Sequence, residues 1–256
     1  MPGARKTLLW AALVATAGAA ATLLYFRQAE VPTAPVTVAA VDALIPAATP
    51  AAASAARDPG LNDSDPIMLE AMRTLIGAAG VSQYLEPQGI VRRIVTTVDS
   101  LPRVHTTKTQ LPIRAQIGGF IATGDDEQRT PIAIENFARY APYIQLLSAL
   151  DVRTLARLYE AHSAWFEQAY AELKHTDAPP TFRARLDQAI ETLLATPEPS
   201  EPVLIYRPEA VYEFADPAFA TLPVGEKLLL RMGPTNASFV RGKLRELKAA
   251  LATPAS

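Results

Sequence analysis

The feature that most constrains this chain is an uncharged apolar stretch near its N-terminus, Leu8 to Phe26, nineteen residues long. A helix of that length measures about 28 Å, close to the thickness of a bilayer core. Arg5 and Lys6 precede the stretch and Arg27 follows it. Because the more basic flank stays in the cytoplasm, the sequence predicts a single-pass inner-membrane protein. Residues 1–7 are then cytoplasmic, residues 8–26 form a transmembrane helix, and the remainder is periplasmic.

A cleaved signal peptide is the alternative interpretation of this stretch. Ala19 and Ala21 have the small-x-small spacing that signal peptidase accepts. The apolar run continues beyond them to Phe26, which makes it longer than the roughly 7–15 apolar residues of a usual signal peptide. We therefore favour an uncleaved anchor.

A segment rich in alanine and proline follows the predicted anchor. Residues 28–60 contain twelve Ala and five Pro. Proline interrupts helices, and a segment with few large apolar side chains cannot form a core. We predict a disordered linker at 27–60, which connects the anchor to a folded domain at 61–251. A short tail at 252–256 follows that domain.

The domain at 61–251 is predicted to be mainly helical. Apolar residues recur at helical spacing in four stretches, 87–101, 152–173, 182–193 and 240–251. Of these, 152–173 has the clearest pattern and is predicted to be one helix. Asp65 followed by Pro66 is typical of a helix start, in which the Asp side chain caps free amide groups.

One part of the domain has the pattern of a small β-hairpin. Short apolar runs at 117–123 and 130–134 flank the acidic turn 124–127, as in two strands joined by a turn. The extended segment Val203–Tyr206 is a candidate to pair with them. The expected fold class is therefore a multi-helix globular domain with a small β-hairpin, preceded by the transmembrane helix.

Charge and composition disfavour several classes of function. Four of the 24 Lys/Arg and three of the 26 Asp/Glu precede Leu61, so the domain has a net charge of about −3, which disfavours a nucleic-acid partner. The chain contains no cysteine, which excludes disulfides, thiolate metal sites and cysteine nucleophiles. It also lacks the phosphate-binding loop, the nucleophile elbow and the zinc-protease motif. We therefore predict no catalytic residue, cofactor or metal site.

The three histidines are too far apart to form a recognisable metal motif. His162 falls on the apolar face of the 152–173 pattern and is expected to be a hydrogen-bonded core residue. His105 and His175 are expected in solvent-facing loops.

Two groups of residues are candidate binding sites. Arg92, Arg93 and Arg103 lie near Asp99 and can hold an anion or a partner's carboxylates through paired guanidinium donors. Internal salt bridges to Asp99 and acidic neighbours are the simpler interpretation. The second group is a helix stop and start at 233–236, where exposed amides, with Arg231, can receive an anion. Capping by Thr235 or Asn236 is the simpler interpretation there.

Several strings of residues, in one order along the chain, resemble the bacterial domain of unknown function family 3014 (DUF3014). These strings are 64–66, 91–102, 136–140, 212–217 and 227–237. The resemblance covers nearly all of 61–250 and implies a single-pass envelope protein that carries this one domain. It implies no activity, cofactor or catalytic residue.

Three functions are compatible with these observations. The favoured one is a noncatalytic, membrane-anchored envelope module that binds a protein or a cell-wall component. The second is a hydrolase of envelope polymers that uses dispersed carboxylates or His162. The third is a sensor that binds a small anion at Arg92, Arg93 and Arg103.

Overall fold

The computed structural model describes residues 59–105, 112, 120–121, 129–208 and 212–253. The predicted anchor and the linker up to Asp58 lie outside these ranges. Among the described residues, no helix has the length and apolarity needed to cross a membrane. They are mainly helical and carry one small antiparallel sheet, which confirms the expected fold class in these two respects.

The elements follow one another in a simple order. They are η2 (Leu61–Asp63), α2 (Ser64–Tyr84), α3 (Ile90–Ser100), β1 (Thr130–Pro131), α4 (Ile134–Ala138), α5 (Ala141–Ser148), α6 (Val152–Ala161), α7 (Ser163–Ala171), α8 (Phe182–Leu194), β2 (Leu204–Tyr206), β3 (Glu213–Phe214), α9 (Pro217–Ala220), α10 (Val224–Met232) and α11 (Pro234–Ala252).

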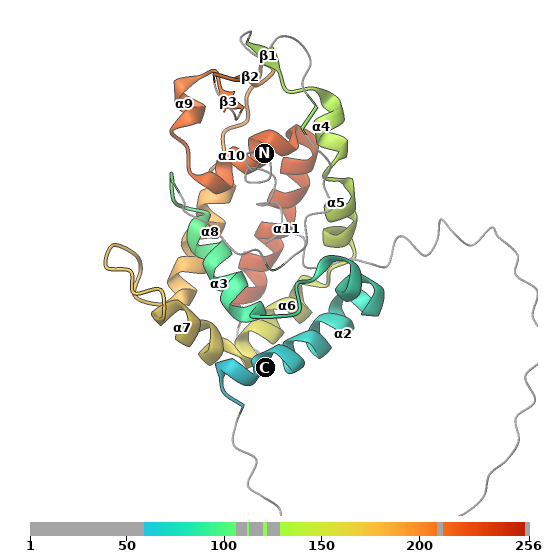
Figure 1. Cartoon of the computed structure of the whole chain (residues 1–256), viewed down its shortest axis with the longest axis vertical. Coiled ribbons are helices and arrows are strands. Elements are labelled where there is room, and N and C mark those ends of the chain that lie inside the picture. The colour runs from blue at the N-terminus through green and yellow to red at the C-terminus, as the bar shows by residue number, and fades with distance from the viewer. Residues whose placement is uncertain (1–58, 106–111, 113–119, 122–128, 209–211, 254–256) are drawn as a thin grey trace, which may run out of the picture.

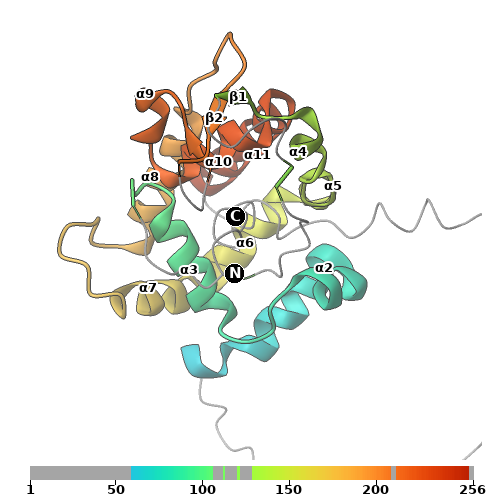
Figure 2. The same cartoon turned by 45° about the horizontal axis from the view of Figure 1, so that its top comes forward.

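The helices pack around α11, and the sheet and α2 lie at opposite ends of the molecule (Figures 1 and 2). Helix α11 contacts α5, α6, α8 and α10, while α3 contacts α2, α7 and α8. The chain enters the folded part at Pro59, next to α2. Pro59 is fixed there because its carbonyl accepts a hydrogen bond from the Trp165 indole, 2.9 Å away.

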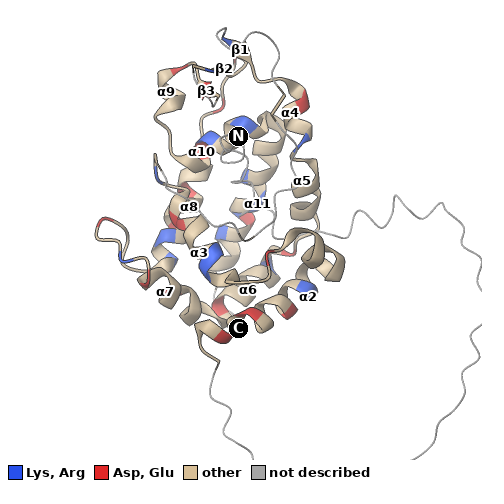
Figure 3. Ribbon diagram, viewed as in Figure 1, with Lys and Arg blue, Asp and Glu red and all other residues tan. Residues whose placement is uncertain are grey.

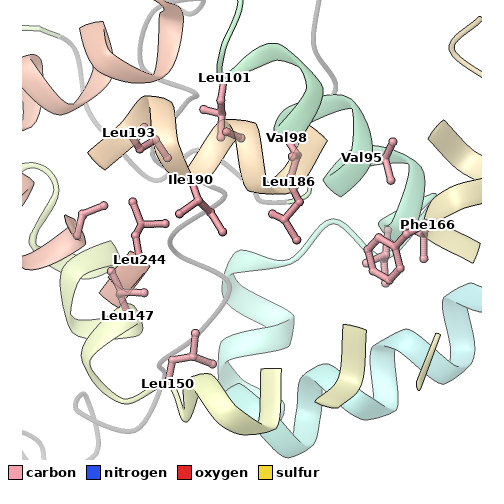
Figure 4. Close-up of a cluster of buried hydrophobic side chains, with 14 of the residues drawn as sticks. Val95, Val98, Leu101, Leu147, Leu150, Phe166, Leu186, Ile190, Leu193 and Leu244 are labelled. Atoms are coloured by element: carbon pink, nitrogen blue, oxygen red, sulfur yellow. The ribbon is translucent and has the colours of Figure 1, made fainter. Parts of the chain in front are cut away.

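The main core lies between these helices. Val98 from α3, Leu186 and Ile190 from α8, and Leu244 from α11 point toward the same interior (Figure 4). Burying a side chain of this size contributes about 1.5–3 kcal/mol. A smaller apolar cluster of Ile132, Ile205, Phe214 and Leu230 joins the sheet to α10. The predicted patterns at 182–193 and 240–251 correspond to α8 and the second half of α11.

The predicted single helix at 152–173 is wrong, because the structure divides it into α6 and α7. The break is at His162, which has φ −121° and ψ 19°. Helix α6 packs on α11, whereas α7 packs on α3 and α8. The apolar period continues through the break because both helices bury residues in the same core. His162 is partly exposed rather than a core residue, and its ring stacks on Trp165 at 4.3 Å.

The sheet differs from the predicted hairpin in its partners. Strand β1 pairs antiparallel with β2, with Thr130 opposite Ile205, and β2 pairs antiparallel with β3. The segment 203–206, a candidate to pair with the predicted hairpin, does pair with the second run of that hairpin through β1, but β3 was not predicted. Of the other expected strand, 117–123, only Phe120 and Ile121 are described, and neither belongs to a strand. Pro131 is tolerated because β1 is an edge strand.

Two carboxylates cap helices that are distant in sequence. Asp65, expected to cap its own helix, accepts hydrogen bonds from the amides of Gly89 at 2.7 Å and Ile90 at 2.9 Å, at the start of α3. Glu167 in α7 accepts from the amides of Phe182 at 2.7 Å and Arg183 at 3.0 Å, at the start of α8. Each carboxylate satisfies two free amides and faces the positive end of the helix dipole.

Candidate functional site

Asp99, near the end of α3, is the buried centre of a polar cluster. Its carboxylate contacts Arg185 Nε at 2.9 Å, Arg103 Nε at 3.0 Å and His175 Nε2 at 3.0 Å. Arg185 also donates to the Asp99 carbonyl at 2.8 Å. We name these four residues the Asp99 cluster. It joins α3, α8 and the loop after α7.

The Asp99 cluster has a structural role, because its ion pairs hold α3 against α8. The side chains of Asp99 and Arg185 are 7% and 6% exposed, and both acceptor oxygens of the carboxylate are occupied. Each of the three guanidinium nitrogens of Arg185 donates a hydrogen bond, because Nη1 donates to Gln188 Oε1 at 2.7 Å. Buried charges need such complete pairing, since desolvation costs several kcal/mol for each ion.

Sequence reasoning found Asp99 and Arg103 and missed the other two members. Arg185 lies between Phe182, Leu186 and Ala189 on the buried face of α8. A charged residue at such a position requires a carboxylate partner, and this was the available signal. His175 lies in an exposed loop as expected, but its ring contacts Asp99. No local pattern indicates that contact.

The structure does not bring Arg92 and Arg93 together with Arg103. Arg92 binds Glu172 at 2.7 and 3.0 Å and Asn62 at 2.8 Å. The hydrogen bond between Arg92 and Glu172 raises the pKa of Arg92 and lowers the pKa of Glu172. Arg93 donates to the Gln88 carbonyl at 2.7 Å. An anion would therefore have to compete with separate internal partners for each guanidinium.

Arg231 and Asn236, the other predicted site residues, hold the sheet end together. The Arg231 guanidinium lies 4.5 Å above the Phe214 ring, and burial lowers its pKa. Asn236 Nδ2 donates to the carbonyls of Phe137 at 3.0 Å and Met232 at 2.9 Å. Asn236 therefore caps carbonyl groups near the ends of α4 and α10 and does not cap the amides of α11.

Asn136 is a buried polar residue that was not predicted as part of a site. It is 1% exposed. Its Oδ1 accepts from the Ile121 amide at 3.0 Å, and its Nδ2 donates to the Ile121 carbonyl at 2.8 Å. Arg139 also donates to Oδ1, at 2.9 Å. The Asn136 side chain thus makes the pair of hydrogen bonds that a neighbouring strand would make, and it fixes Ile121 against α4. This gives a structural role to the first residue of the string 136–140, one of those that resemble the family.

A groove of about 1070 Å³ lies beside the sheet. One wall is the segment 196–203 and the other is formed by α10 and the first turns of α11. We name it the sheet-end groove. Leu229, Leu230 and Phe239 are among its apolar lining residues, and the exposed carboxylates of Glu198 and Glu201 also line it.

One buried charge faces the sheet-end groove. Arg241 is 6% exposed and pairs with Glu198 Oε1 at 2.6 Å. This pair holds the 196–203 segment against α11. Elsewhere in the described residues Lys/Arg and Asp/Glu are mixed along the helices, as seen in Figure 3. No group of three or more His, Asp or Glu suited to a metal ion occurs among the described residues.

The profile of one protein family, described as Protein of unknown function (DUF3014), matches residues 90–248. That range contains the Asp99 cluster and the sheet-end groove, while the string at 64–66 in α2 precedes it. No curated protein and no solved structure matches the chain. Because the profile match covers more than half of the 256 residues, the chain belongs to the DUF3014 family.

Proposed function

We propose that this chain is a noncatalytic, membrane-anchored envelope module that binds an extended segment of a partner protein in the sheet-end groove. The apolar stretch at 8–26 is the anchor, and residues 27–60 connect it to the domain. The observation that carries the proposal is the size and chemistry of the groove.

The position of the groove suits a tethered binding module. The chain enters the folded part at Pro59, beside α2, and the sheet lies at the other end (Figure 1). A linker attached at that point leaves the sheet end accessible to partners away from the membrane. Such a linker of about 30 residues has a random-coil span of roughly 30 Å.

The lining of the groove favours a peptide with apolar and basic residues. Phe239, Val203 and Pro202 supply accessible apolar surface, while Glu198 and Glu201 supply negative charge at exposed positions. Electrostatic complementarity selects partners of opposite charge. The partner segment is therefore expected to place a Lys or Arg beside Glu201, since Glu198 is already paired with Arg241.

Site-specific photo-crosslinking of the full chain in its native membrane tests this proposal. A photoreactive residue at Thr235, which is exposed and lines the groove, is expected to capture a partner protein. The matched control is the same photoreactive residue in place of Arg73, in α2 at the opposite end of the molecule, where it is expected to capture no partner protein. Fragment sequencing is expected to place the crosslink in an apolar segment with a basic residue.

Charge reversal separates specific docking from incidental contact. Glu201→Lys is expected to reduce the Thr235 adduct at least tenfold, and Glu70→Lys, an equal change on α2, is expected to leave it unchanged. An adduct that muramidase removes would identify a wall glycan and reject the protein-partner proposal. Equal adducts from Thr235 and Arg73 would also reject it.

A hydrolase is the second candidate, because Glu198 and Glu201 line the same open groove. Glycoside hydrolysis usually requires two carboxylates near the scissile bond, and these two lie on the same wall of the groove. This alternative predicts that purified full chain releases fragments from cell-wall material and that Glu201→Gln abolishes the release. Equal release by the wild type and this variant would exclude it.

A further inference from the structure

A small apolar pocket of about 100 Å³ lies within the main core, between α2, α3, α6, α7, α8 and α11. Met68, Met72, Val98 and Phe182 form its inner wall and are almost fully buried. We name it the inter-helix pocket. Its outer wall consists of partly exposed residues, including Leu155, Leu158 and Leu247, so that side faces solvent.

The volume and the lining limit what this pocket can hold. An apolar cavity of about 150 Å³ stays dry and accommodates benzene or xenon. Scaled from benzene's six carbons, about 100 Å³ corresponds to roughly four carbon atoms. Water is disfavoured because it requires two to four polar partners. A short unbranched hydrocarbon segment therefore fits, while a six-membered ring does not.

Tyr159 is the one residue with a polar side chain in this lining. Its ring is fixed between Phe166 and Phe182, with ring centroids at 5.3 and 6.0 Å. No hydrogen bond of its hydroxyl is found among the described residues. A tyrosine hydroxyl already keeps its proton at neutral pH, and burial raises the pKa of Tyr159 further, to about 12, so the phenol remains a hydrogen-bond donor.

We propose that the inter-helix pocket binds the end of an alkyl chain, and that the Tyr159 hydroxyl donates a hydrogen bond to an oxygen of the same ligand. The ligand is thus an amphiphile with an unbranched chain end of about four carbons inside the pocket. A free amphiphile and a membrane lipid both offer this chemistry. The chain end contacts Val98 in either case.

Methyl NMR of the full chain in lipid nanodiscs, with 1-pentanol as the probe, tests the proposal directly. Pentanol is expected to give intermolecular NOEs to the methyl groups of Val98 and Leu158 and none to Val91, which is buried outside the pocket. NOEs from lipid chain protons before pentanol is added would identify lipid as the source. NOEs from pentanol alone would identify a free amphiphile. No NOE from either to Val98 and Leu158 overturns the proposal, and so does benzene binding as strongly as pentanol.

Two variants in α3 provide a matched test of the volume. Val98→Leu adds one methylene into the pocket and is expected to weaken pentanol binding about tenfold without lowering the melting temperature. Val91→Leu makes the same change at a packed position of the same helix. It is expected to lower the melting temperature and leave pentanol binding unchanged. If the two variants have equal effects on melting and binding, the volume is not available to a ligand.

The hydroxyl is tested separately. Tyr159→Phe is expected to weaken pentanol binding about fivefold, which corresponds to one net hydrogen bond, and to leave pentane binding unchanged. Equal losses for pentanol and pentane, or no loss for either, would overturn the assigned role of the hydroxyl.

Discussion

Asp99 and Arg185 form an ion pair 2.9 Å apart in which both side chains are at most 7% exposed. The pair joins α3 to α8, and its charges have little access to bulk water. Removing the Asp99 charge leaves the Arg185 guanidinium buried without its carboxylate, which costs more than the intact pair contributes.

The first prediction follows from the cost of leaving a buried charge without its partner. Asp99→Asn is expected to lower the free energy of unfolding by about 3–5 kcal/mol, measured by urea denaturation followed by circular dichroism. The control is Glu172→Gln, which breaks the exposed pair with Arg92 and is expected to cost less than about 1 kcal/mol. Similar losses of unfolding free energy in the two variants would contradict the assignment of Asp99 and Arg185 as a buried, stabilising ion pair.

The same pair illustrates what sequence reasoning could find. The helical period predicted α3, α8 and the second half of α11 because their apolar residues define single faces. Asp99 and Arg103 are one helical turn apart, so their pairing is visible in the sequence. The contact of Asp99 with Arg185 depends on how α3 and α8 pack, which no local pattern encodes.

Tertiary contacts also explain the errors. Asp65 has the local signature of a cap for its own helix, yet it binds the amides of Gly89 and Ile90, because α2 and α3 pack together. The break at His162 leaves the apolar period intact, so periodicity alone cannot locate it. The sheet-end groove could not be predicted either, because its walls come from two distant parts of the chain.

The second prediction concerns Glu226 in the first turn of α10. The residue is 8% exposed, and burial raises the pKa of its carboxyl from the usual 4.5. A group whose pKa is higher in the folded protein favours folding most when it is protonated. That contribution disappears as the pH rises from about 4.5 through the folded pKa.

Glu226→Gln removes the ionisable group and is therefore expected to stabilise the protein at pH 7, by about 1 kcal/mol. At pH 4 and below the gain is expected to vanish, because the wild-type carboxyl is then protonated. Urea denaturation across pH 3.5 to 8 measures both. Glu135→Gln, at an exposed position in the first turn of α4, is the control and should show no such pH dependence. A gain that is constant with pH would contradict the explanation.

The third prediction concerns Lys174, the one described residue other than glycine with positive φ, at 53°. It directly precedes His175 of the Asp99 cluster. A left-handed conformation costs a residue with a side chain about 1 kcal/mol, and glycine avoids that cost. Lys174→Gly is expected to raise the melting temperature by a few degrees. Lys174→Ala removes the same charge without relieving the backbone, and an equal rise in that variant would refute the strain argument.

The fourth prediction concerns Gly233, which joins α10 to α11 at φ 82°. A Cβ atom there would lie 2.6–2.8 Å from atoms of the Phe137 ring. Gly233→Ala therefore combines backbone strain with a steric clash and is expected to destabilise the protein by more than about 2 kcal/mol. Gly242→Ala is the matched control, since a Cβ at that position of α11 meets nothing within 4 Å, and it is expected to stabilise the helix by up to about 1 kcal/mol.

Because Gly233 and Phe137 both line the sheet-end groove, Gly233→Ala is also expected to weaken the Thr235 crosslink, whereas Gly242→Ala is not. Loss of the crosslink in both variants would indicate that the groove responds to changes along all of α11 and would refute a local role for Gly233.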